Sequence, residues 1–189
     1  MIGRIYVVGI TGNAGSGKDT FAKAVRNVSF GEFSLTAVAM AIREVVEIIW
    51  GVETDTQEEK AAIVFGDITG RFLLQEVGKK MREIDPDAWI KALKTSIRNY
   101  ECEHVGIIIV TDIRYQVEAD ICDEVWRIVR PDHSILEGRE AQHESEKSID
   151  KVIENLVIMN DGTLEELQTK ARTLAEEVLL RAKTKRWGR

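Results

Sequence analysis

Nine consecutive residues near the start of the chain have the types and spacing of a phosphate-binding loop. They are Gly12, Asn13, Ala14, Gly15, Ser16, Gly17, Lys18, Asp19 and Thr20, and they follow an apolar run and open a helical pattern. Such glycines let backbone N–H groups close around a phosphate, and the helix N-terminus adds partial positive charge. Lys18 then reaches the β- and γ-phosphates. The loop therefore predicts a site for nucleotide phosphates.

The loop departs from the usual pattern at the residue after the lysine. A Ser or Thr hydroxyl that ligates Mg²⁺ is usual there, whereas this chain has Asp19 followed by Thr20. Asp112 directly follows an apolar strand candidate, at the strand end where doubly wound sheets bind ligands. We predict Asp19, Thr20 and Asp112 as magnesium contacts, in part through water. For Asp112, a hydrogen bond from a substrate hydroxyl is the alternative.

A helical segment in the middle of the chain carries a polar face. Its members recur at spacings that share one side of a helix: Arg71, Gln75, Gly78, Lys79 and Arg82. The opposite side is apolar: Leu73, Leu74, Val77, Met81 and Ile84. A solvated charged face is one interpretation and a ligand-binding face is the other. Gly78 favours binding, because a glycine inside a helix costs about 1 kcal/mol and suits close approach of a ligand or another backbone.

Several arginines offer planar forks of donors that match phosphates. Arg114 lies two residues after Asp112, and Arg43 lies beside the apolar face of the helix after the second strand. Three more lie in or after the fourth strand, near Pro131 and Gly138: Arg127, Arg130 and Arg139. We expect a lid-like segment, about residues 131–148, to bring such cations over ATP. For each arginine, an ordinary surface position is the alternative.

Two further groups of reactive residue types are interpreted as structural. His143, Ser145 and Glu146 resemble a hydrolytic trio, but within one helix they point in different directions. A capping or lid-packing role is predicted for them. Cys102 and Cys122 lack a metal-ligand spacing and are interpreted as free thiols.

The elements that must position these residues alternate between strands and helices. The strand candidates are Arg4 to Thr11, Phe33 to Val38, Val105 to Thr111, Glu124 to Val129 and Leu156 to Met159. This alternation predicts an α/β fold with three layers around a five-stranded parallel sheet. Residues of about 39–100 form a helical block, broken near 51–56, 66–70 and 85–86, that we expect to build a second pocket over one sheet edge. An amphipathic helix beginning near Leu164 closes the domain.

Composition limits the classes of function. The 189 residues, 44% of them hydrophobic, fit one domain spanning 1–189. A net charge of −6 argues against a nucleic-acid polymer as the main partner. The sequence has no apolar run long enough for a membrane span and no signal-peptide pattern, so no membrane partner and a cytoplasmic location are expected.

The residues resemble those of the bacteriophage deoxynucleoside monophosphate kinases, within the adenylate-kinase-like group of phosphate-loop kinases. The resemblance spans almost the whole chain, in the right order. Besides the loop ending at Thr20, its pieces are Ala39 to Arg43, Leu74 to Gly78 with Trp89, Thr111 to Arg114 with Glu118 and Ala119, Trp126 to Pro131, His143 to Glu146, and Asn160 to Thr163.

The resemblance implies transfer of the γ-phosphoryl group of ATP to the 5′-phosphate of a deoxynucleoside monophosphate (dNMP), with Mg²⁺, in a monomer or homodimer. If the gene is viral, the location is the host cytoplasm. It implies ATP contacts from the loop and from Arg127, Asn160, Gly162 and Thr163. It implies an acceptor site formed by Arg43, Arg71, Gln75, Gly78, Lys79, Trp89, Asp112 and Arg114. The catalytic residues it implies are Lys18, Arg114 and Arg130. Met40 and Lys79 depart from the pattern of relatives, which leaves the base preference open.

Three other classes of function compete with this interpretation. One is another small-molecule kinase of the same fold, such as a phosphomevalonate kinase or a broad nucleoside monophosphate kinase. A second is a module that binds ATP without phosphorylating a small molecule, which leaves the polar face of residues 71–82 unexplained. A guanine-nucleotide switch is disfavoured, because the sequence has no Asn-Lys-x-Asp motif.

Overall fold

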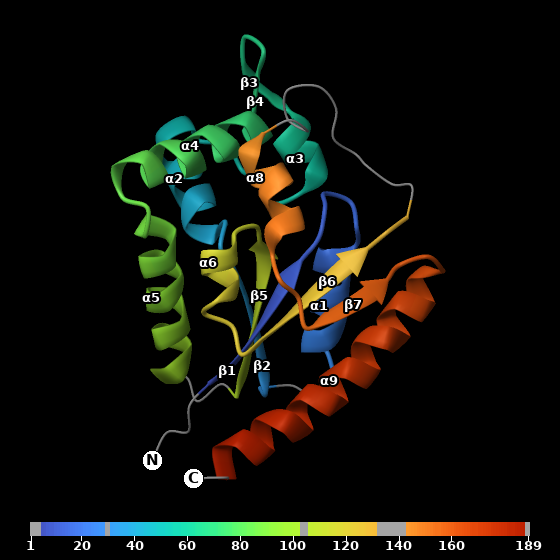
Figure 1. Ribbon diagram of the computed structural model, residues 1–189. Coiled ribbons are helices and arrows are strands. Elements are labelled where there is room, and N and C mark those ends of the chain that lie inside the picture. Colours follow the sequence, from blue (N-terminus) through green and yellow to red (C-terminus); the bar gives the residue numbers. More distant parts are fainter. Residues whose placement is uncertain (1–4, 29–30, 103–105, 132–142, 188–189) are drawn as a thin grey trace.

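A five-stranded parallel sheet forms the centre of the protein (Figure 1). The computed structural model describes residues 5–28, 31–102, 106–131 and 143–187. The strands are β1 (Tyr6–Thr11), β2 (Phe33–Ala37), β5 (Ile107–Ile113), β6 (Glu124–Val129) and β7 (Leu156–Met159). Their order is β2-β5-β1-β6-β7, and each neighbouring pair is parallel. The predicted fold class is confirmed.

Helices cover both faces of the sheet, which is why β1 and β5 are buried along their whole length. On one face α1 (Lys18–Arg26) and α9 (Leu164–Trp187) pack on the strands. There the Phe21 ring meets the Trp126 ring edge-on, with centroids 6.1 Å apart. On the other face lie α2 (Met40–Trp50), α5 (Ala88–Cys102) and α6 (Gln116–Ala119). These two cores give the three predicted layers.

One strand boundary differs from the prediction in a way that matters for the site. The prediction ends the third strand at Thr111, whereas β5 continues through Asp112 to Ile113. The pairing of β1 with β5 shifts register between Gly9 and Thr11, and Asp112 has a φ of 62°. This irregular end of β5 turns the Asp112 side chain out of the regular strand alternation.

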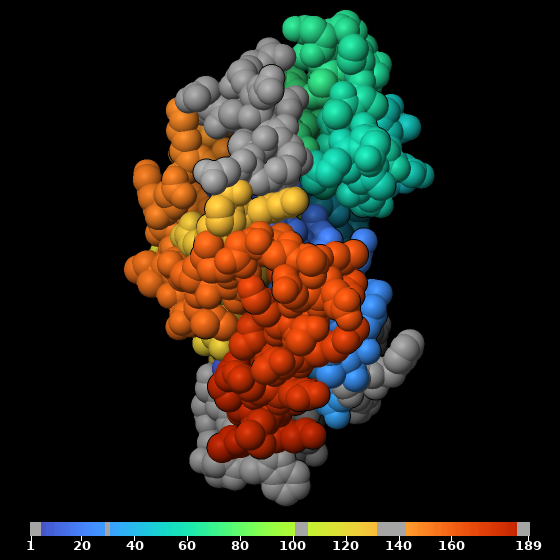
Figure 2. Space-filling view, turned by 90° about the vertical axis from the view of Figure 1, so that its right-hand side faces the viewer, coloured from blue at the N-terminus to red at the C-terminus, as the bar shows by residue number. Residues whose placement is uncertain are grey.

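The chain between β2 and β5 forms a helical region over the carboxyl ends of the strands. Besides α2 and α5 it contains α3 (Gln57–Ala61), α4 (Gly70–Ile84) and a hairpin of β3 (Ile63–Phe65) and β4 (Ile68–Thr69). The hairpin corrects the prediction of a simple helix break, since residues of high strand propensity flank Gly66, whose φ is 56°. Figure 2 shows the teal and green residues of this region at the end of the molecule away from the last turns of α9.

The segment before β7 contains α8 (Glu144–Lys147) and a 3₁₀ turn, η1 (Ser148–Lys151). Of the predicted lid, residues 132–142, including Arg139, lie outside the described residues. None of the helices in the described residues combines the length and the apolar composition needed to cross a bilayer.

Candidate active site

The phosphate-binding loop joins β1 to α1 and has the backbone of an anion cradle. Gly12 has a φ of 147°, and a Cβ there would lie 2.5 Å from the Ile128 carbonyl oxygen, so no other residue fits. The first turn of α1 has no side-chain cap, which leaves its N–H groups free to bind an anion. The Ser16 hydroxyl is buried, and no residue of the described chain hydrogen-bonds to it. The loop therefore presents unused donors where a phosphate would sit.

The end of β7 supports this loop from the other side. The Asn160 amide donates a hydrogen bond to the Ser16 carbonyl oxygen at 2.8 Å, and a Cβ on Gly17 would lie 2.6 Å from that amide nitrogen. Thr163, by contrast, caps the start of α9 through reciprocal hydrogen bonds with Glu166. The structure thus brings Asn160 to the loop. The ATP contacts expected of Gly162 and Thr163, both exposed, stay a prediction.

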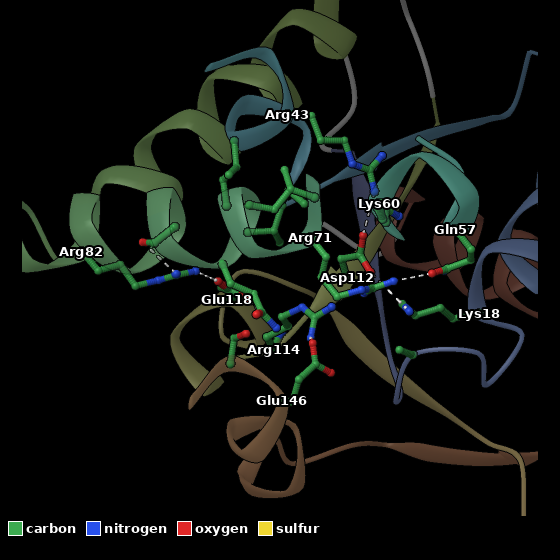
Figure 3. Close-up of a pocket in the computed structure, with 18 residues that line it drawn as sticks. Lys18, Arg43, Gln57, Lys60, Arg71, Arg82, Asp112, Arg114, Glu118 and Glu146 are labelled. Carbon is green, nitrogen blue, oxygen red and sulfur yellow. Dashed lines mark hydrogen bonds and ion pairs between the residues drawn. The ribbon is translucent and has the colours of Figure 1, made fainter. Parts of the chain in front are cut away.

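Asp112 joins the loop to the helical region by two ion pairs (Figure 3). Its carboxylate lies 3.4 Å from the Lys18 ammonium and 3.2 Å from a terminal nitrogen of Arg43. Burial opposes its ionisation, but Lys18, Arg114 and Arg43 outweigh burial and hold the pKa of Asp112 well below its usual range. Asp112 is therefore an ionised carboxylate that holds two phosphate-binding candidates together.

A cavity extends from the loop between α2, α3 and α4, and its wall is rich in cations. Its charged side chains are the cations Lys18, Arg43, Lys60, Arg71, Arg82 and Arg114, and the carboxylates Asp112, Glu118 and Glu146. The apolar part of the lining includes Ala14 of the loop together with Val38, Ile42 and Leu74. Six cations against three carboxylates leave an excess of positive charge, which suits a phosphorylated ligand.

The helical segment with the predicted polar face is α4, and most residues of that face line this cavity. Arg71, Gln75, Gly78 and Arg82 are all part of the lining. Arg82 pairs with the buried Glu118 at 3.0 Å and donates to the Gly78 carbonyl oxygen at 3.0 Å. Lys79 is exposed and lies outside the lining. Lys79, for which an acceptor contact was predicted, therefore does not line this cavity.

Trp89, a second predicted acceptor contact, lies away from the cavity wall. The indole is 5% exposed, packs in the core between α5 and the sheet, and is absent from the cavity wall. Its Nε1–H donates to the Gly78 carbonyl oxygen at 3.0 Å. Because the indole is buried beneath α4, Trp89 supports that helix and does not form a wall of the cavity.

Arg127, within β6, and Arg130, directly after β6, lie outside the cavity wall. Arg127 donates to the carbonyl oxygens of Ile149 and Val152 at 2.9 and 2.7 Å and pairs with Glu154 at 3.1 Å. These contacts give Arg127 a structural role in fastening η1 to β6. Arg130 follows β6 and is exposed. Roles of Arg127 and Arg130 in binding ATP or in catalysis stay predictions.

Arg114 connects the cavity to α8. Its guanidinium pairs with Glu146, and its backbone N–H donates to Glu118 at 2.8 Å. Although burial disfavours its charge, Glu146 and Asp112 outweigh burial and raise the pKa of Arg114. His143 accepts a hydrogen bond from the Ser145 backbone N–H at 3.2 Å, which confirms the predicted capping role.

Three polar residues of the cavity wall had no role predicted from the sequence: Gln57, Lys60 and Glu118. Gln57 accepts a hydrogen bond from Arg71. Gln57 and Lys60 are three residues apart and so share one face of α3, which is the only sequence signal for them. The position of that face depends on the hairpin, which the sequence did not reveal.

The fold and the loop define a phosphate-loop α/β nucleotide-binding protein, with a second, cationic cavity beside the nucleotide loop. A sequence model described as deoxynucleotide monophosphate kinase matches residues 66–171, more than half of the 189 residues. The chain belongs to this family of ATP-dependent phosphotransferases.

Two comparisons with other proteins complete these findings. No curated protein matches the chain. Among solved structures, it is similar to shikimate kinase from Aquifex aeolicus at 15% identity, covering 92% of this chain and 98% of that one, with a TM-score of 0.43. It is also similar to dephospho-CoA kinase from Campylobacter jejuni at 13% identity, covering 91% and 96%, with a TM-score of 0.48.

Proposed function

We propose that the chain binds ATP at residues 12–20 and a dNMP in the cavity, and transfers the γ-phosphoryl group to the 5′-phosphate of the dNMP. The observation that carries this proposal is that Lys18 belongs to both sites: it opens α1 in the loop and lines the cavity. A single cation then lies where the donor and acceptor phosphates must meet.

The reaction brings two anions together, so charge neutralisation and positioning supply most of the catalysis. The acceptor oxygen is already anionic, and no general base is required. We assign Lys18 to the transferring phosphoryl group, and Arg43, Arg71 and Arg114 to the acceptor phosphate. The half-buried ion pairs of Arg43 and Arg114 support this assignment, because they hold both guanidinium groups at the cavity before substrate arrives.

Magnesium enters this proposal as the companion of ATP. No group of three or more His, Cys, Asp or Glu side chains within residues 5–28, 31–102, 106–131 and 143–187 is arranged to hold a metal ion. Mg²⁺ on a nucleotide usually keeps several waters and needs only one or two carboxylates, so Asp19 at the start of α1 fits that requirement. Thr20 and Asp112 are proposed to contact the ion through water. The bound ion would supply further neutralisation of the β- and γ-phosphates.

The test is ADP release by the full chain with ATP and Mg²⁺ across dAMP, dCMP, dGMP, dTMP, AMP and phosphomevalonate. We expect turnover with one or more dNMPs and its loss on chelation of Mg²⁺. Lys18→Ala should lower kcat by on the order of 100- to 1,000-fold, whereas Lys23→Ala, an exposed change on the same helix, should not.

Two results would contradict the proposal. ATP binding without acceptor-stimulated ADP release would support a non-catalytic module. Preferential turnover of AMP or phosphomevalonate would support a kinase with another acceptor.

A further inference from the structure

Lys60 is a buried cation in the cavity whose ammonium group has no partner among the described residues. The residue is 8% exposed and lines the cavity from α3. Its ammonium has neither an ion pair nor a hydrogen bond within the described ranges. Four other cations of the wall are paired with carboxylates: Lys18 and Arg43 with Asp112, Arg82 with Glu118, and Arg114 with Glu146. Burying an uncompensated charge is costly, so the position of Lys60 calls for an anion that the protein itself does not provide.

The charges around Lys60 come from three other elements. Burial lowers the pKa of Lys60, and the cations Arg43 and Lys18 lower it further. Asp112 and Asp19 act in the opposite direction but do not cancel these effects. An anion entering the cavity would therefore relieve both the desolvation and the repulsion that Lys60 experiences.

The local structure fixes α3 before any ligand binds. Thr56 and Glu59 form a capping box, in which the Glu59 carboxylate accepts hydrogen bonds from the backbone N–H groups of Asp55 and Thr56 at 2.8 Å. A Cβ on Gly70 would lie 2.9 Å from the Glu59 carbonyl oxygen, so the first turn of α4 packs directly on the α3 backbone. A pre-ordered binding group loses less entropy when its ligand arrives.

The same face of α3 also contacts α4 at the wall of the cavity. Gln57, one turn before Lys60, accepts a hydrogen bond from Arg71 of α4. Figure 3 shows Lys60 beside Arg43 and Asp112, with Arg114 and Glu146 on the other side of Asp112 in this view. The loop supplies backbone N–H groups and Lys18 to the donor phosphates, and cationic side chains of α2, α3 and α4 line the rest of the cavity.

We propose that Lys60 binds the 5′-phosphate of the acceptor nucleotide, together with Arg43. The proposal rests on the proposed function and adds a residue of α3 to the acceptor site. Lys60 then supplies one of the positive charges that offset the dianionic phosphate as it approaches the γ-phosphate of ATP.

The test compares Lys60→Met and Lys60→Arg with Lys94→Met, an exposed change on α5, in the full chain. Kinetics use ATP and whichever of dAMP, dCMP, dGMP and dTMP is turned over fastest. We expect Lys60→Met to raise KM for the dNMP by on the order of 10- to 100-fold, to leave KM for ATP within about twofold, and to be partly rescued by Lys60→Arg. Calorimetry should show that Lys60→Met weakens binding of the dNMP but not of the matching deoxynucleoside, which lacks the phosphate.

A pH profile separates this role from a purely structural one. Loss of the Lys60 proton should lower kcat/KM for the dNMP on the alkaline side, and Lys60→Arg should remove that alkaline decline because a guanidinium keeps its proton. Equal weakening of dNMP and deoxynucleoside, or a rise in KM for ATP alone, would overturn the proposal. If the wild type turns over dNMPs and Lys60→Met matches it, this inference fails while the proposed function stands. If the wild type neither binds nor turns over any dNMP, both fail.

Discussion

Asp112→Asn tests whether one buried carboxylate holds Lys18 and Arg43 in place before a nucleotide binds. The substitution keeps the shape of the side chain. Asn also tolerates the φ of 62° at this position, as few other residues do. The change therefore removes the negative charge and leaves the backbone of β5 undisturbed.

The expected loss of stability follows from the two ion pairs. At 3.4 and 3.2 Å, with an effective dielectric constant of about 20, each attraction amounts to about 5 kcal/mol before desolvation is counted. Breaking a buried pair by removing one partner costs about 3–5 kcal/mol net. We expect Asp112→Asn to lower the free energy of unfolding by about that amount at pH 7. Because ATP phosphates would replace the missing charge, ATP without Mg²⁺ should stabilise the variant more than the wild type.

Urea denaturation at pH 7 in the absence of Mg²⁺, with and without ATP, measures both effects. The matched control is Asp85→Asn, which breaks the exposed pair of Asp85 with Lys91 and should cost less than about 1 kcal/mol. If Asp112→Asn costs no more than this control, or if ATP stabilises variant and wild type equally, the reasoning about Asp112 is wrong.

The stability difference between wild type and Asp112→Asn should depend on pH. Since the pKa of Asp112 is lowered in the folded protein, its contribution to stability is fully present above the unfolded pKa of about 3.9. That contribution is lost as the pH falls through the folded pKa. The difference in unfolding free energy between wild type and Asp112→Asn should therefore be constant from about pH 5 to 8 and should shrink below about pH 4. A difference that grows on acidification would contradict the direction of the shift.

Two further substitutions test the roles of Trp89 and Arg127. Trp89→Phe removes the hydrogen bond to the Gly78 carbonyl oxygen and should lower the free energy of unfolding by about 1 kcal/mol in a urea titration. We expect KM for the dNMP to stay within about twofold. A large rise in that KM would show that Trp89 contacts the acceptor nucleotide. Arg127→Met removes two hydrogen bonds to carbonyl oxygens and the pair with Glu154, so we expect about 2–4 kcal/mol of destabilisation with KM for ATP unchanged. Normal stability with a tenfold higher KM for ATP would instead assign Arg127 to the nucleotide.

The parts of the site that the sequence predicted are those that depend on local backbone geometry and on strand order. The loop at Gly12 to Thr20 needs only a strand, glycines and a helix start, and all three are adjacent in the sequence. Asp112 and Arg114 were predicted because the carboxyl ends of parallel strands meet at one edge of the sheet. Both line the cavity beside Lys18.

The parts that the sequence missed depend on how distant elements pack. Helix α3 is too short, at five residues, to give a periodic pattern, so its cavity-facing side is set by the hairpin and by contact with Gly70. The indole of Trp89 suits a ligand wall and a core equally well. Its burial beneath α4 is decided by the packing of α5 on the sheet, which composition and spacing do not encode.

Lys79 differs from Trp89, because helical geometry alone separates Lys79 from the other residues of the polar face. Successive residues of a helix are about 100° apart around its axis. Measured from Arg71 on α4, Gln75 lies at about 40° and Arg82 at about 20° in the same direction. Gly78 lies at about 20° in the opposite direction. These four residues span about 60° of the helix surface, and all of them line the cavity. Lys79 lies about 80° from Arg71, beyond that arc, and it is exposed. Residues on the edge of a polar face should therefore be assigned to a site only when their angle falls among those of the other members.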